Sequence, residues 1–80
     1  MVYIVKDLDA VKEQMSHCRF TLYRVIEHPD KYEVRIKAGS IAWKGTFDKK
    51  DPKLEELKKL LDTYQAVEVA STMADEVFLT

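Results

Sequence analysis

Residues 31–48 read KYEVRIKAGSIAWKGTFD, two stretches of alternating apolar and polar residues that are joined by Gly39-Ser40. Glycine at the first central position of a two-residue turn supplies the positive φ of a type II′ turn, so the pattern predicts a β-hairpin whose register follows from the turn. The facing pairs are then Ala38 with Ile41, Ile36 with Trp43, Val34 with Gly45, and Tyr32 with Phe47. One face of the hairpin is expected to be apolar, and the other carries Glu33, Arg35, Lys37, Ala42, Lys44 and Thr46.

Residues 19–27 are rich in aromatic and β-branched side chains and predict a third strand before the hairpin. The number of residues in the intervening loop decides which face of this strand meets the core, because side chains alternate along a strand. An even loop pairs Glu27 with Tyr32 and directs Tyr23 and Val25 to the core, and an odd loop directs Phe20, Leu22 and Ile26 there. We favour the odd loop, because it buries more apolar surface.

Two amphipathic helices are predicted on either side of the three strands. Residues 8–17 follow a capping Asp7 and carry an apolar stripe, and residues 52–65 begin at Asp51-Pro52, a capping side chain followed by proline at the first helical position. The expected fold is α+β, an antiparallel three-stranded meander over about 19–27, 32–38 and 41–47, packed by both helices. Extra strands are expected at 2–5 and at 66–70 or 76–79, with the first of these pairing with one of the last two.

The chain has 80 residues and is expected to form one small domain over residues 1–80. Its net charge of −1 conceals a strong asymmetry. Residues 19–59 contain eleven Lys or Arg and seven Asp or Glu, whereas residues 60–80 contain four acidic residues and no Lys or Arg. A basic centre of this kind permits an anionic partner despite the overall charge.

Sequence motifs for nucleotide, metal and nucleophilic chemistry are absent from the chain. There is no glycine-rich phosphate loop, no H-E-x-x-H and no cysteine pair, since Cys18 is alone. We therefore expect no enzymatic activity, no cofactor, no metal and no small-molecule substrate, and we take His28 as a solvated turn residue. No apolar run is long enough to cross a membrane and the N-terminus does not have the pattern of a secretory signal, so a cytoplasmic location is expected.

Several short motifs resemble the AP2-type DNA-binding domain, and related sheet-plus-helix modules occur at the N-terminus of some phage integrases. The motifs are Tyr23-Arg24-Val25, Lys31-Tyr32, Ile36-Lys37, Trp43 and Gly45-Thr46-Phe47-Asp48. The resemblance covers about residues 22–65 and implies a sheet that enters the major groove of DNA, with Trp43 toward the DNA and Lys44 toward the core. The turn register implies the reverse for these two residues, and we follow the register because burying lysine in place of tryptophan is costly. The order of helix, strands and helix is also similar to the double-stranded RNA-binding domain.

Two functions agree with these features. The first is a small nucleic-acid-binding module that binds DNA or RNA through a basic sheet face, using Arg19, Tyr23, Arg24, Arg35, Lys37, Trp43 and Lys44. The cationic side chains would contact phosphates, and Tyr23 or Trp43 would stack or pack against sugar and base. The second is a small regulatory or inhibitory protein of the type found in phages and mobile elements, which binds another protein or itself through apolar side chains that the helices leave uncovered.

Overall fold

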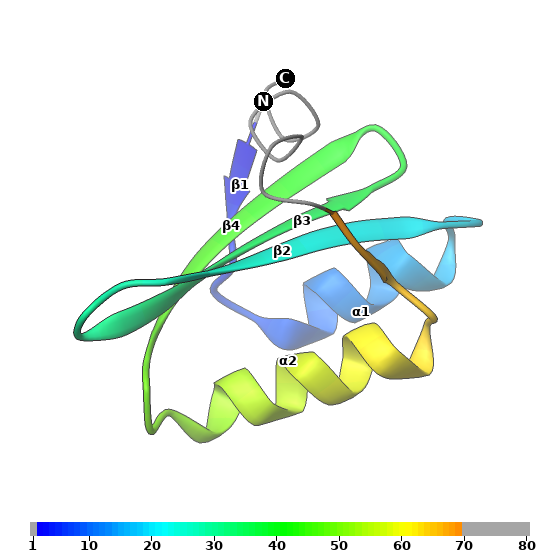
Figure 1. Ribbon diagram of the computed structural model, residues 1–80. Coiled ribbons are helices and arrows are strands. Elements are labelled where there is room, and N and C mark those ends of the chain that lie inside the picture. Colours follow the sequence, from blue (N-terminus) through cyan, green and yellow to red (C-terminus); the bar gives the residue numbers. More distant parts are fainter. Residues whose placement is uncertain (1, 70–80) are drawn as a thin grey trace.

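The computed structural model describes residues 2–69, which form a mixed five-stranded sheet and two helices (Figure 1). In chain order the elements are β1 (Val2–Ile4), α1 (Leu8–Ser16), β2 (Thr21–Glu27), β3 (Lys31–Ala38), β4 (Ile41–Asp48), α2 (Pro52–Thr63) and β5 (Val67–Glu68). The α+β class, both helices and the three central strands are confirmed, with ends that differ from the prediction by one or two residues. The strand expected at 76–79 lies outside the described residues.

The hairpin of β3 and β4 has the register that the turn predicts. Ala38 pairs with Ile41 and Ile36 pairs with Trp43, and the pairing continues to the far end of both strands. Gly39 has a φ of 64°, and no non-glycine residue in 2–69 except Gln65 has a positive φ, so Ser40 has a negative one. This combination is that of a type II′ turn. The local turn chemistry therefore sets which side chains share a face of the sheet.

The favoured odd loop between β2 and β3 is wrong, because Glu27 pairs with Tyr32. The backbone N–H of His28 donates to the carbonyl oxygen of Lys31 at 2.9 Å and closes a four-residue turn, which is the even arrangement. Side chains of β2 that point toward the helices are Thr21, Tyr23 and Val25, and those on the opposite face are Leu22, Arg24 and Ile26. The odd register would have placed Arg24 against the helices together with its apolar neighbours, and a guanidinium there costs more than those neighbours gain.

The order of strands in the sheet is β1-β4-β3-β2-β5, with both outer strands parallel to their neighbours. The expected pairing of the N-terminal strand with residues 66–70 is wrong, since β1 pairs with β4 and β5 pairs with β2 at the other edge. Just after β1, the backbone N–H of Val5 donates to the carbonyl oxygen of Lys44 at 2.8 Å. Gly45 permits this approach, because a Cβ at that position would lie 3.0 Å from the Cβ of Val5.

Both helices cover the same face of the sheet (Figure 1). Each begins at an aspartate whose side chain accepts a backbone N–H of the first turn, Asp7 for α1 and Asp51 for α2. The buried core between helices and sheet comprises Val11, Met15, Val34, Ile36, Ala38, Phe47, Leu54, Leu57 and Leu61. We call the opposite surface of the sheet the helix-free face. Neither α1 nor α2 has the length and apolar character of a membrane-crossing helix.

We predict that Leu57→Ala lowers the free energy of unfolding by about 2 to 5 kcal/mol, because the substitution leaves a cavity in a fully buried site. Urea denaturation followed by circular dichroism measures this change. Lys58→Ala is the matched control, since Lys58 is the next residue of α2 and is exposed. A loss for Leu57→Ala no larger than that of the control would contradict the placement of α2 on the sheet.

Candidate functional site

Three cationic side chains lie directly opposite one another on the helix-free face. Arg24 of β2 is the cross-strand partner of Arg35 of β3, and Arg35 is in turn the partner of Lys44 of β4. Neighbouring strands are about 4.8 Å apart, so this row of residues spans about 10 Å. We call these three residues the cationic row. Like charges in directly opposite positions destabilise a sheet, so the row requires a compensating interaction.

Glu33 supplies the first compensating charge. It lies two residues before Arg35 on β3, on the same face, and its Oε2 is 2.8 Å from Nε of Arg35 and 3.9 Å from Nζ of Lys44. Its Oε1 is 3.2 Å from Nε2 of His28. Only 11% of the Glu33 side chain is exposed, so these contacts stand in place of water. One buried carboxylate thus links two members of the cationic row to the turn that precedes β3.

The surroundings of Glu33 act on its pKa in opposite directions. Burial raises the pKa, because it disfavours the charged carboxylate. The hydrogen bonds from Arg35 and His28 and the positive charges of Arg35 and Lys44 lower it, and together they outweigh burial, so that the pKa lies below its ordinary value. Glu33 is therefore ionised at neutral pH and remains a fixed negative charge within the cationic row.

Glu68 of β5 compensates the third member of the cationic row. Its Oε1 is 3.6 Å from Nη1 of Arg24, and the same guanidinium nitrogen donates to the carbonyl oxygen of Val69 at 3.3 Å. The side chain of Arg24 is 27% exposed, whereas that of Lys44 is 49% exposed. The row is thus held in place by carboxylates and still presents cationic surface to the solvent.

Lys37 adds a fourth positive charge to the helix-free face. It lies two residues beyond Arg35 on β3, which places it about 7 Å along the strand, between Leu22 of β2 and Ala42 of β4. The cationic row and Lys37 together carry four positive charges, and within residues 2–69 the carboxylates of Glu33 and Glu68 lie against the row. Among residues 2–69, cations therefore outnumber carboxylates in this cluster.

The structure brings together four of the seven residues predicted to bind nucleic acid, namely Arg24, Arg35, Lys37 and Lys44. Arg19 is exposed in the connection between α1 and β2 and lies outside the strands. Tyr23 and Trp43 lie on the helix side of the sheet, where they pack against the core. The expectation that Tyr23 or Trp43 stacks beside the basic side chains on one face is therefore wrong, because alternation along β2 and β4 directs these rings to the other face.

Trp43 is a packing residue on the helix side of the sheet. Its ring lies against that of Tyr3 of β1, with centroids 5.4 Å apart and planes inclined by 39°. Its Nε1 is buried and has no hydrogen-bond partner among residues 2–69. Trp43 in the core and Lys44 at the surface is the arrangement that the turn register predicted, and it is opposite to the one implied by the resemblance to the AP2-type domain.

Three residues of this cluster were missed by sequence reasoning, and one of them is Glu68, because the pairing of β5 with β2 was not predicted. Glu33 was placed on the polar face of the hairpin, and its spacing of two residues from Arg35 could have indicated the ion pair. His28 was taken as a solvated turn residue, but its ring contacts the carboxylate of Glu33. No local pattern indicates this second contact, because the His28 ring reaches Glu33 across the turn.

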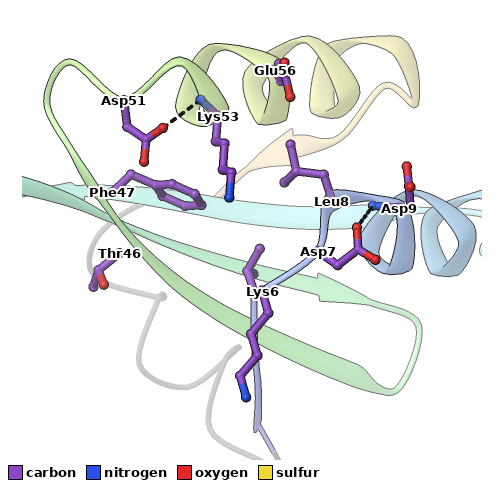
Figure 2. A pocket seen from close by; sticks show the side chains of 10 residues that line it. Lys6, Asp7, Leu8, Asp9, Thr46, Phe47, Asp51, Lys53 and Glu56 are labelled. Atoms are coloured by element: carbon purple, nitrogen blue, oxygen red, sulfur yellow. Dashed lines mark hydrogen bonds between the residues drawn. The ribbon is translucent and has the colours of Figure 1, made fainter.

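A pocket of about 370 Å³ lies between the N-terminal ends of α1 and α2, on the helix side of the sheet (Figure 2). The capping carboxylates are on either side of it, with Asp7 accepting the N–H of Asp9 at 3.0 Å and Asp51 accepting the N–H of Lys53 at 2.9 Å (Figure 2). The charged residues in the lining are Lys6, Asp7, Asp9, Asp51, Lys53 and Glu56. The lining thus has two basic and four acidic residues, which makes the pocket unfavourable for an anion. The capping aspartates also already accept backbone N–H groups at the N-terminal ends of both helices.

Within residues 2–69, no three His, Cys, Asp or Glu side chains gather in a way that could hold a metal ion. Comparison with protein-family models, with curated proteins and with solved structures finds no match. The resemblance to the AP2-type domain remains a prediction, and the candidate site rests on its own geometry. That site is the cationic row with Lys37, held by Glu33 and Glu68 on the helix-free face.

We predict that Glu33→Gln destabilises the protein at about pH 7 by about 1 to 3 kcal/mol, because the substitution removes the charged partner of Arg35, Lys44 and His28. The pKa of Glu33 is depressed in the folded state, so its stabilising effect is complete above the unfolded value of about 4.3 and is lost as the pH falls through the folded value. The stability difference from the wild type should therefore shrink at about pH 3.

Urea denaturation of both proteins at the two pH values measures this dependence. Glu55→Gln is the matched control, because Glu55 is 71% exposed and pairs with Lys58 only at 3.9 Å. Its substitution should have an effect near zero at either pH. An equal loss for Glu33→Gln at both pH values would show that the carboxylate charge does not stabilise this face.

Proposed function

We propose that this protein is a small, non-enzymatic nucleic-acid-binding module and that the cationic row with Lys37 forms its binding surface. The observation that carries the proposal is the alignment of Arg24, Arg35 and Lys44 on three neighbouring strands. If basic side chains on a polar sheet face served only to keep the protein soluble, they would not need to lie directly opposite one another on neighbouring strands. Aligning three cations costs stability and needs two carboxylates to compensate, which is the local conflict expected at a functional surface.

The physical basis of the proposal is counterion release. Each phosphate that a cationic side chain neutralises frees condensed counterions, so binding weakens steeply as the salt concentration rises. Four contacts from Arg24, Arg35, Lys37 and Lys44 correspond to a slope of log K against log salt of about −3 to −4. Glu33 and Glu68 limit the net charge of the cluster, which favours the shallower end of that range.

The charge distribution along the chain supports the same surface. All four cations belong to residues 19–59, the segment with an excess of four positive charges, and three adjacent strands present them on one face. The helix side carries a different pattern, in which lysines of α2 alternate with acids such as Glu55, Glu56 and Asp62. The helix-free face is therefore the more favourable surface for a polyanion.

We predict that Lys37→Gln combined with Lys44→Gln makes the salt slope less negative by about 1.8, since two phosphate contacts of about 0.9 each are removed. Fluorescence anisotropy of a labelled nucleic acid at several salt concentrations measures the slope. Glutamine keeps much of the aliphatic stem, and loss of the contact from Lys44 to Glu33 at 3.9 Å should leave the fold intact. A thermal melt of the double variant checks this directly.

Lys53→Gln combined with Lys59→Gln is the matched control, because it removes the same charge from exposed positions of α2 on the other side of the sheet. Its salt slope should equal that of the wild type. Equal slopes for all three proteins would place the binding surface elsewhere, and absence of binding at low salt would overturn the proposed function.

A second candidate function is protein binding or self-association by a small regulatory or inhibitory protein. Its supporting observation is that Phe20 is 61% exposed and Val67 is 57% exposed, near the edge where Leu22 of β2 pairs with Val67 of β5. Apolar side chains rimmed by charge are typical of an interface. Light scattering after size-exclusion chromatography distinguishes the two candidate functions. A dimer that dissociates in the Phe20→Ser variant, together with absence of nucleic-acid binding, would favour self-association.

A further inference from the structure

The aromatic side chains of the three central strands all lie on one side of the sheet. Tyr23, Tyr32, Trp43 and Phe47 belong to the core or pack against it on the helix side. The strand positions of the helix-free face in β2, β3 and β4 are occupied by Leu22, Arg24, Ile26, Lys31, Glu33, Arg35, Lys37, Ala42, Lys44, Thr46 and Asp48. These positions include no aromatic ring on which a base could stack.

We propose that the helix-free face binds the phosphate backbone of double-stranded DNA, in preference to single strands and without reading the base sequence. This inference rests on the proposed function and specifies its ligand. Sheets that bind single strands do so by stacking bases on aromatic side chains, each stacked base being worth roughly tenfold in affinity. The cationic row and Lys37 provide charge without such a platform.

Charge density then decides between duplex and single strand. A DNA duplex carries one negative charge per about 1.7 Å of its axis, and each phosphate contact adds about 0.9 to the salt slope, against about 0.7 for a single strand. Four contacts give a difference in slope of about 0.8. When the salt concentration falls from about 1 M to about 0.1 M, the affinity for the duplex therefore rises about sixfold more than the affinity for the single strand. One or two stacked bases would reverse this order.

The contacts of the two arginines reduce the number of N–H groups that could read bases. Reading a guanine requires a guanidinium that offers two N–H groups in a fork. Nη1 of Arg24 contacts Glu68 and the carbonyl oxygen of Val69, and Nε of Arg35 contacts Glu33, so these contacts take up one of the two N–H forks of each guanidinium. Lys37 and Lys44 act as point charges, which suit phosphate contacts and not a base-edge pattern.

The helix-free face also favours a DNA duplex over an RNA duplex. Discrimination in favour of RNA depends on contacts to the 2′-hydroxyl, and double-stranded RNA is recognised largely through such contacts across its minor groove. Thr46 is the one neutral hydrogen-bonding side chain at the strand positions of β2, β3 and β4 on this face.

The test is a set of anisotropy titrations at about 0.1 M salt with four labelled probes of about 20 nucleotides or base pairs. The probes are two DNA duplexes of unrelated sequence, one of their single strands, and an RNA duplex of the same sequence. We expect both DNA duplexes to bind within about threefold of each other and about sixfold more tightly than the single strand. The RNA duplex should bind no more tightly than DNA.

Phe20→Ala provides the second variant, because Phe20 is an exposed ring just before β2 that could stack a base from the margin of the sheet. Its affinity for the duplex should equal that of the wild type. Equal or tighter binding of the single strand, a more than tenfold difference between the two DNA duplexes, or tighter binding of RNA would each overturn the inference while leaving the proposed function in place. Failure to bind any probe would overturn the proposed function itself.

Discussion

The register set by Gly39-Ser40 is the constraint on which the rest of the structure depends. Side chains alternate along a strand, so the turn decides for both strands of the hairpin which residues meet the helices. With the observed pairing, Ile36 and Trp43 face α1 and α2 while Arg35 and Lys44 face away. A slip of one residue in β4 would place Lys44 in the core and Trp43 in the solvent, reversing both the packing and the charge pattern.

Once the register aligns the cations, carboxylates are needed to hold them. Glu33 lies within the cluster and contacts Arg35, Lys44 and His28, so β3, β4 and the turn before β3 converge on one charged group. Buried charges of this kind stabilise a structure only when they are paired, and removal of one partner leaves the others uncompensated. The positive character of the face and its stability are therefore linked through the same carboxylate.

Short-range chemistry explains which parts of the fold and of the candidate site could be predicted. The hairpin, the helix caps at Asp7 and Asp51 and the apolar stripes are local patterns, and they placed Arg35, Lys37 and Lys44 on one face. The partners of β1 and β5 could not be predicted, because parallel pairing is non-local and has no turn to specify it. The loop before β3 was predicted to have an odd number of residues, because the prediction counted the apolar side chains of β2 and overlooked Arg24 among them. As a result, Tyr23 was assigned to the wrong face of the sheet.

An NMR titration of the ¹⁵N-labelled protein with a short DNA duplex, following each backbone amide, tests most directly whether the helix-free face binds nucleic acid. We predict shifts concentrated in β2, β3 and β4 around Arg24, Arg35, Lys37 and Lys44, together with loss of the shifts at high salt. Amides on the outer surface of α2, such as that of Lys59, should be unaffected. Shifts confined to the helices, or their absence from the three central strands, would contradict the assignment of the helix-free face as the binding surface.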